Sequence, residues 1–181
     1  MGYDTKTIEQ AWSLLDEATV RYQGEDVGTV AALATGTDAV NHDQKEKILH
    51  LLEVNWEMLV GSMPIKLCYP ALKGKAWHIL TGADGKNTPW SYHNGGNWPT
   101  LLWLLIAAAV RMNNKAVATA AMETAAKRLP ADDWPEYYDG QFGNLVGKEA
   151  RKKQIWTAAG FIAAHSILES PGKIKLLIFD D

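Results

Sequence analysis

Ten consecutive apolar residues occupy positions 101 to 110 of this chain, with the sequence LLWLLIAAAV. A surface helix keeps a polar side toward water, and this run has none, so it predicts a helix that is buried on most of its sides. The run is too short to cross a bilayer, for which a helix needs about 20 apolar residues. We therefore expect a core helix and no membrane partner.

Helical patterns recur on both sides of this core helix. Asn97 is placed to cap it, with Pro99 in its first turn. Short extended pieces are expected at residues 66–69 and 77–80, and the tail IKLLIFDD is either a short strand or a packed extension. Helices in succession, without βαβ alternation, predict an all-α architecture. Apolar periodicity and breaker residues predict the other helices at residues 5–22, 43–60, 115–128 and 148–168.

Charge and cysteine content exclude several classes of protein. The chain has 18 Lys and Arg residues against 21 Asp and Glu, with no basic stripe, so we expect no nucleic-acid partner. Cys68 is the single cysteine, which rules out an internal disulfide and suits a reducing compartment. The start MGYDTKTIEQ lacks the apolar core of a signal peptide, so a cytoplasmic location is expected. The histidines and Cys68 show no zinc-ligand spacing, which predicts no metal site.

A loop rich in glycine and aromatic residues is the first candidate site. The segment NTPWSYHNGGNWP holds Trp90, Tyr92, His93, Asn94 and Trp98 within nine positions. Flat aromatic faces beside amide and imidazole groups suit a sugar, which has apolar C–H faces and many hydroxyls. The alternative is a glycine turn braced by core tryptophans before a helix.

A second candidate lies in the acidic segment DDWPEYYDG. It offers Asp132, Asp133, Glu136 and Asp139, and aromatic residues flank only Glu136 on both sides, namely Trp134 before it and Tyr137 and Tyr138 after it. An apolar surround desolvates a carboxyl group and favours acid/base chemistry. The alternative is a solvated acidic loop between helices.

The basic segment GKEARKKQIW is expected at the start of the last helix. Lys148, Arg151, Lys152 and Lys153 would there oppose the helix dipole, so one explanation is that some of them point into a site. A solvated basic face is the alternative, and it fits Lys152 and Lys153 better than Arg151.

Three long segments carry a family resemblance. They are KLCYPALKGKAWHILTGADGKNTPWSYHNGGNWPTLLWLL, KRLPADDWPEYYDG and GKEARKKQIWTAAGFIAAH. Together, from about residue 40 to about residue 168, they resemble the neutral/alkaline invertases, glycoside hydrolase family 100. The resemblance implies an (α/α)6 barrel, hydrolysis of sucrose to glucose and fructose, and no metal or organic cofactor.

The resemblance also implies roles for individual residues. An inverting glycosidase uses a general acid to protonate the glycosidic oxygen and a general base to activate water. The glutamate of the family motif WPEYYDG, here Glu136, is implied to be the base. Sugar contacts are expected from the loop, the acidic segment and the basic segment, at Trp90, Tyr92, His93, Asn94, Trp98, Trp134, Tyr137, Lys148, Arg151 and Gln154.

The chain is expected to be only the C-terminal part of such a barrel. The family's general acid is an aspartate from the earlier half, and no segment here matches it. We expect residues 1–39 to be a divergent helical segment and residues 40–181 to be barrel, with five or six helices. An open arc would expose an apolar side of the run 101–110 and drive self-association or docking to a missing barrel half. Weak or no hydrolysis is therefore expected; the alternative is a non-catalytic helical remnant that binds sugar or protein.

Overall fold

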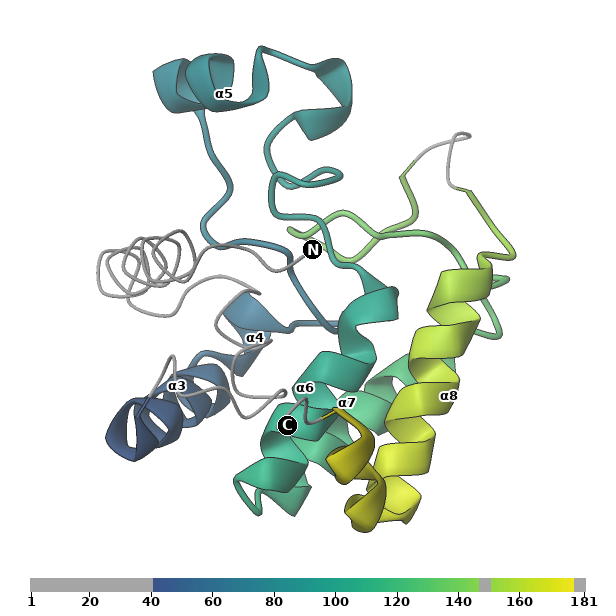
Figure 1. Ribbon diagram of the computed structural model, residues 1–181. Helices are drawn as coiled ribbons and strands as arrows, with labels where there is room; N and C mark the ends of the chain where they lie inside the picture. Colours follow the sequence, from purple (N-terminus) through teal and green to yellow (C-terminus); the bar gives the residue numbers. More distant parts are fainter. Residues whose placement is uncertain (1–40, 147–150, 178–181) are drawn as a thin grey trace, which may run out of the picture.

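The computed structural model describes residues 41–146 and 151–177, and within these ranges the chain is all-α (Figure 1). Extended contacts there are limited to isolated bridges between single residues. The helix expected at 5–22, the divergent segment 1–39 and Lys148 lie outside the described residues. The α-helices are α3 (His42–Val54), α4 (Trp56–Leu59), α5 (Gly74–Thr81), α6 (Leu102–Arg111), α7 (Lys115–Arg128) and α8 (Ile155–Glu169). The 3-10 helices are η1 (Gly85–Asn87), η2 (Pro99–Leu101) and η3 (Pro171–Leu177).

Helix α6 is the centre of the fold, as its unbroken apolar sequence predicts. It packs against α7, α8, η2 and η3, and in Figure 1 it lies between α3 and α8. Leu105, Ile106 and the alanines that follow are fully buried. The expected apolar side open to water is therefore not found on α6, because α7 and α8 cover it.

The helix expected over residues 43–60 is divided at Asn55. The Asn55 side chain donates a hydrogen bond to the carbonyl oxygen of Leu51 at 3.0 Å, and its backbone leaves the helical region at φ −114° and ψ 28°. An asparagine that bonds the preceding turn competes with the helical backbone, which accounts for the break. At the other end, Asn41 and Gln44 form a capping box that starts α3.

Helix α7 has the bounds that the sequence predicts. The side chain of Asn114 accepts a hydrogen bond from the backbone N–H of Val117 at 3.1 Å and so caps the helix. Asn113 turns the chain into it with φ at 56°. A local cap and an alanine-rich sequence suffice to specify this element.

Three expectations about the loops and helix ends are wrong. Residues 77–80 lie in α5 and are not extended. Asn97 does not cap the core helix; Trp98 takes the cap position of η2, and Asn97 pairs its backbone with Tyr138. Helix α8 begins at Ile155, later than expected. The tail forms η3 as far as residue 177, where Ile174 and Leu177 pack against the core, so the alternative of a packed extension is confirmed over these residues.

The late start of α8 has a long-range cause. The backbone N–H groups of Lys153 and Gln154 donate to the carbonyl oxygens of Asp133 and Trp134, at 2.8 and 2.9 Å. These bonds hold the segment before α8 beside the acidic loop in a non-helical form, with φ at 56° for Lys153. The basic residues thus precede the helix, so the expectation that rested on the helix dipole no longer applies to them.

Candidate active site

Three short segments from distant parts of the chain meet at the N-terminal ends of α6 and α8. Asn97 forms bridges with Lys66 on one side and Tyr138 on the other, and Tyr138 forms one with Leu145. Bridge partners lie on one face and their chain neighbours lie on the opposite face. The bridges therefore place Lys66, Asn97 and Tyr138 on one face, and Trp98 and Tyr137 on the other.

An aromatic cluster lies on the face of Trp98 and Tyr137. These two rings are stacked, with centroids 5.5 Å apart and planes at 17°. Tyr92 packs against both at 5.1 and 5.4 Å, and His93 stacks on Tyr92 at 4.0 Å. Trp156, from the first turn of α8, meets Trp98 edge-on at 6.3 Å. The cluster offers flat ring surfaces with an imidazole at its exposed edge.

Glu136 is a buried carboxylate next to this cluster in the chain. The residue is only 4% exposed, and its side chain lies 3.9 Å from Nε of Arg151. Its backbone N–H donates to the carbonyl oxygen of Arg151 at 2.7 Å. The preceding carbonyl, that of Pro135, accepts a hydrogen bond from the buried hydroxyl of Thr157 at 2.9 Å. Glu136 is thus fixed between the basic segment and α8.

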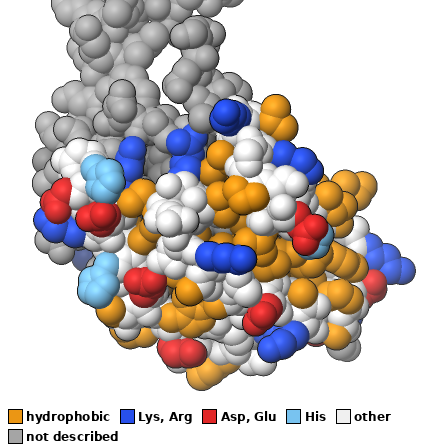
Figure 2. Space-filling view, turned by 90° about the horizontal axis from the view of Figure 1, so that it is seen from below, with side chains coloured by type: hydrophobic (Ala, Val, Ile, Leu, Met, Phe, Trp, Pro, Cys, Tyr) orange, Lys and Arg blue, Asp and Glu red, His pale blue; other side chains and the backbone are white. Residues whose placement is uncertain are grey.

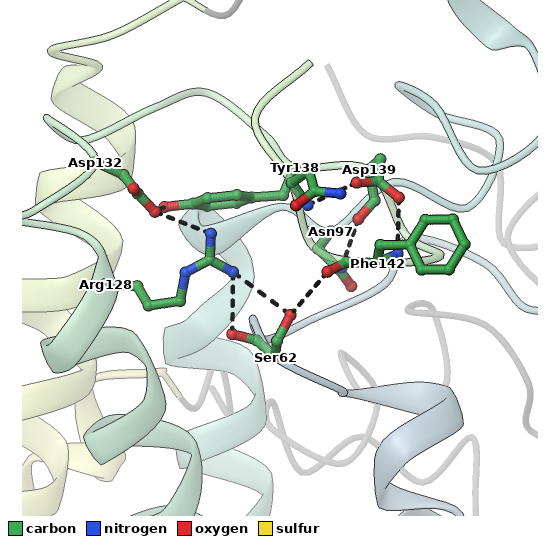
Figure 3. A network of polar contacts seen from close by, with 8 residues as sticks. Ser62, Asn97, Arg128, Asp132, Tyr138, Asp139 and Phe142 are labelled. Carbon is green, nitrogen blue, oxygen red and sulfur yellow. Dashed lines mark hydrogen bonds and ion pairs between the residues drawn. The ribbon is translucent and has the colours of Figure 1, made fainter. Parts of the chain in front are cut away.

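A polar network supports the loop from behind (Figure 3). The hydroxyl of the fully buried Tyr138 donates to Asp132 at 2.9 Å, and Arg128 binds the same carboxylate at 3.0 Å. The guanidinium also lies 4.5 Å from the centre of the Tyr138 ring. Burial and the bond to Asp132 raise the pKa of Tyr138, so it remains a neutral donor. Asp132 is therefore a structural carboxylate of the loop.

Asp139 also stabilises the loop. Its carboxylate accepts hydrogen bonds from the backbone N–H groups of Gln141, Phe142 and Asn144, the last at 2.6 Å. Such bonds stabilise a turn. Of the four carboxylates in the acidic segment, Glu136 is the one that is buried and beside a cation.

Lys66 is a buried charge that the sequence did not single out. It is 7% exposed, and burial lowers the pKa of its ammonium group to about 8, against the opposing attraction of Asp139 and Glu57. Asn97, its bridge partner, has a buried side-chain oxygen for which the described residues offer no hydrogen-bond partner. An ammonium and an amide oxygen therefore share the face behind the aromatic cluster.

The remaining residues that the sequence suggested lie outside the aromatic cluster. Trp90 packs on Tyr69 at 5.7 Å, and Trp134 packs on Phe161 at 5.5 Å. The buried amide of Asn94 binds the backbone of Leu72 and Asn87, so it holds the loop. The amide of Gln154 donates to the carbonyl oxygen of Lys152, and Arg151, Lys152 and Lys153 are exposed.

Metal-binding and membrane-spanning features are absent from residues 41–146 and 151–177. No three His, Cys, Asp or Glu side chains gather there as ligands for a metal ion. None of the helices in these ranges has the length and apolar sequence that a membrane crossing requires.

Comparison with known proteins identifies the family. The model of the alkaline and neutral invertase family matches residues 37–171. The chain belongs to this family. It is 50% identical to alkaline/neutral invertase C, mitochondrial, of Arabidopsis thaliana over 141 residues, which are 78% of this chain and 21% of that protein.

Other invertase relatives show the same partial coverage. Cytosolic invertase 1 of Oryza sativa subsp. japonica is 45% identical over 158 residues, 87% of this chain and 27% of that protein. Probable alkaline/neutral invertase F of Arabidopsis thaliana is 44% identical over 158 residues, 87% of this chain and 30% of that protein. The chain therefore spans between 21% and 30% of the length of these three relatives.

The sequence motifs of this invertase-family chain predicted most residues of the aromatic cluster but not Trp156. That residue was assigned to the last helix, and only the fold places its ring against Trp98. A tryptophan directly after a polar and basic segment was the available signal. Lys66 carried no comparable signal, because a lysine in a loop is ordinarily exposed.

Proposed function

We propose that this chain carries the general-base part of a site that hydrolyses sucrose to glucose and fructose with inversion. Glu136 is the base. The observation that supports this role is a carboxylate that is 4% exposed and lies one residue before Tyr137, whose ring packs on Tyr92 and Trp98 in the aromatic cluster. The basis for sucrose is membership of the invertase family.

Each group near Glu136 has a chemical task in this proposal. The half-buried rings of Tyr92 and Tyr137 pack against the C–H faces of a sugar, and His93 hydrogen-bonds a hydroxyl. The buried ring of Trp98 packs against both tyrosines and supports them. Glu136 removes a proton from water on the face of the sugar opposite the leaving oxygen. The guanidinium of Arg151 lies 3.9 Å from this carboxylate and gives it a partner of opposite charge.

The general acid is proposed to come from outside the matched region. Because the chain spans 21% to 30% of three relatives, residues 40–181 would be the C-terminal part of a larger (α/α)6 domain. Loss of general-acid catalysis costs about 10²–10⁴-fold in rate. The isolated chain should therefore hydrolyse sucrose weakly or not at all, and self-association or docking to a missing barrel half would accompany the incomplete fold.

A cytoplasmic location is part of the proposal. Cytosolic invertase 1 of rice is cytosolic by name, whereas invertase C of Arabidopsis is mitochondrial by name, so the family occupies several compartments. The single cysteine of this chain is compatible with a reducing compartment.

Sugar binding tests the proposal without requiring turnover. Isothermal titration of the full chain with sucrose, glucose and fructose should detect binding of at least one of them. His93→Ala and Tyr92→Ala should weaken that binding about tenfold or more, because each removes a ring of the cluster. Phe142→Ala, a change at an aromatic residue that is 69% exposed and elsewhere, should leave it unchanged.

The same titration, combined with a hydrolysis assay, distinguishes the catalytic function from the alternative of a non-catalytic sugar-binding module. Binding that depends on Tyr92 and His93 but is never followed by hydrolysis, even in a complex with other invertase segments, would favour the non-catalytic sugar-binding module. If none of the three sugars binds, neither the catalytic function nor the sugar-binding module is supported.

A further inference from the structure

Two aromatic surfaces that solvent reaches pack against the buried indole of Trp98. The half-buried rings of Tyr92 and Tyr137 form the first, and the plane of Tyr137 lies within 17° of that of Trp98. Trp156 forms the second and meets Trp98 edge-on, with the two planes at 63°. Within residues 41–146 and 151–177, Trp98 is the one ring that Trp156 contacts. The tyrosines and Trp156 are therefore two separate surfaces, inclined to each other and joined by Trp98.

The backbone that carries Trp156 is held in place by η2. The hydroxyl of Thr100 donates a hydrogen bond to the carbonyl oxygen of Trp156 at 3.1 Å. One turn later, Gly160 packs so closely on the backbone of Thr100 that an added Cβ atom would clash with it. With these contacts and the ring of Trp98 beside it, the indole of Trp156 stays 48% exposed. A large flat ring that is already in place binds a ligand without the entropic cost of ordering it.

The segment that carries Glu136 is connected to both surfaces. Tyr137, which follows Glu136 in the chain, belongs to the first surface. Thr157, which follows Trp156, donates a hydrogen bond at 2.9 Å to the carbonyl oxygen of Pro135, directly before Glu136. An enzyme that cleaves the bond between two sugar units acts on a substrate with one unit on each side of that bond. A carboxylate linked to two aromatic surfaces suits such a substrate.

A hollow at the opposite end of the helices has a different lining. It has a volume of about 320 Å³ and lies at the C-terminal ends of α6 and α8, beside the start of α7. Figure 2 shows the fold from below, with hydrophobic and charged side chains interspersed. No aromatic ring is among the described residues that line the hollow, which are Val110, Asn113, Lys115, Leu168, Glu169 and Pro171. Because sugar C–H faces pack on flat rings, Trp156 is the better candidate for a second sugar contact.

We propose that Trp156 is a specificity-determining residue that binds the second sugar unit of a disaccharide. This inference rests on the proposed function, in which the first unit packs on Tyr92 and Tyr137. The C–H face of the second unit packs on the exposed indole, and the bond between the units lies near Glu136. A single sugar unit covers only one of the two surfaces. The site therefore binds a disaccharide more tightly than a monosaccharide.

Isothermal titration of the full chain, Trp156→Ala and Tyr92→Ala with sucrose, glucose and fructose tests the second surface. Trp156→Ala should weaken the binding of sucrose about tenfold, because it removes a whole indole from the contact. It should leave unchanged the affinity for a monosaccharide whose binding depends on Tyr92. Trp156→Phe keeps a flat ring and should retain most of the affinity for sucrose. Ile162→Ala, at a residue of α8 that is 66% exposed, is the matched control and should have no effect.

The pattern of losses separates this inference from the proposed function. Sucrose binding that depends on Tyr92 but is unchanged in Trp156→Ala would overturn the second surface and leave the proposed function standing. An equal loss of sucrose and of the Tyr92-dependent monosaccharide in Trp156→Ala would also overturn it, because a single surface would then account for both. If none of the three sugars binds, the second surface and the proposed function both fail.

The indole N–H signals in a nuclear magnetic resonance spectrum give a readout on the unmodified chain. The signal of Trp156, assigned by its loss in Trp156→Phe, should shift when sucrose is added. It should not shift with the monosaccharide whose binding depends on Tyr92. Trp103 on α6 packs against the core, and its signal serves as the internal control. A Trp156 signal that sucrose leaves in place, in a chain that binds sucrose, would contradict the assignment of the second surface.

Discussion

At the scale of single residues, backbone contacts hold Glu136 in its buried position. The carbonyl of Arg151 and the hydroxyl of Thr157 both bind the peptide group that precedes its Cα, the first through the N–H of Glu136 at 2.7 Å and the second through the carbonyl oxygen of Pro135 at 2.9 Å. Arg151 thus contributes both its backbone and its guanidinium, although its side chain is 64% exposed. The sequence suggested Arg151 as a sugar ligand, and the fold shows that it also contacts Glu136.

Lys66 gives a stability prediction with a definite sign. Its folded-state pKa is about 8, against 10.5 for the unfolded chain, so unfolding takes up a proton between these values. The free energy of unfolding should therefore rise as pH increases from 8, by a few kcal/mol at most, since one pKa unit is about 1.4 kcal/mol. Urea unfolding below and above pH 8 measures this rise.

Lys66→Met should abolish that pH dependence and stabilise the fold below pH 8, because it removes a charge that burial disfavours. Lys75→Met is the matched control at an exposed lysine of α5 and should change neither quantity. The interpretation of Lys66 is wrong if the wild-type chain and Lys66→Met show the same slope with pH.

At the scale of elements, α8 is held by close packing on η2. Gly160→Ala is therefore expected to destabilise the fold by about 1–3 kcal/mol, since the new methyl group would clash with the carbonyl of Thr100. In an uncrowded helix the same change would stabilise by nearly 1 kcal/mol. Thermal unfolding followed by circular dichroism distinguishes the two signs.

Gly172→Ala supplies the comparison, because no atom lies within 4 Å of the position that its new methyl group would take. It should shift the midpoint of unfolding only slightly. A stabilising Gly160→Ala would mean that α8 and η2 do not pack backbone against backbone.

Elements were predictable where local sequence specifies them. The cap at Asn114 and the alanine-rich sequence define α7, and the unbroken apolar run defines α6. The start of α8 was not predictable, because it depends on backbone bonds to Asp133 and Trp134. Partners distant in sequence leave no local pattern, and the same reason explains why Asn97 pairs with Tyr138 and does not cap a helix.

The residues of the candidate site were also only partly predictable from the sequence. Tyr92, His93, Trp98 and Tyr137 were named from two motifs, and the fold brings them together. Trp90 and Trp134 have the same residue type and the same setting in sequence, but they pack on Tyr69 and Phe161. Composition around a residue identifies the loop, whereas the direction of its side chain depends on the folded backbone, which has positive φ at Tyr92 inside the cluster as well as at Trp90 and Trp134 outside it.

At the scale of the whole molecule, the described fold combines a well-buried core with an incomplete enclosure. Helix α6 is largely buried between its neighbours, while α8 presents isoleucines outward and the aromatic cluster has an open rim at Trp156. The relatives are more than three times as long as the region they share with this chain. In the function we propose, this region supplies the base and the sugar-binding rings, and the opposing acid comes from outside residues 40–181.

The decisive experiment compares sucrose hydrolysis by the full chain with hydrolysis by its Glu136→Gln variant. We expect the full chain to release glucose about 10²–10⁴-fold more slowly than a full-length relative, since we propose that the general acid comes from outside residues 40–181. Glu136→Gln should abolish this residual release while leaving sugar binding intact. Release at the rate of a complete invertase, or residual release that survives Glu136→Gln, would contradict the role given to this carboxylate.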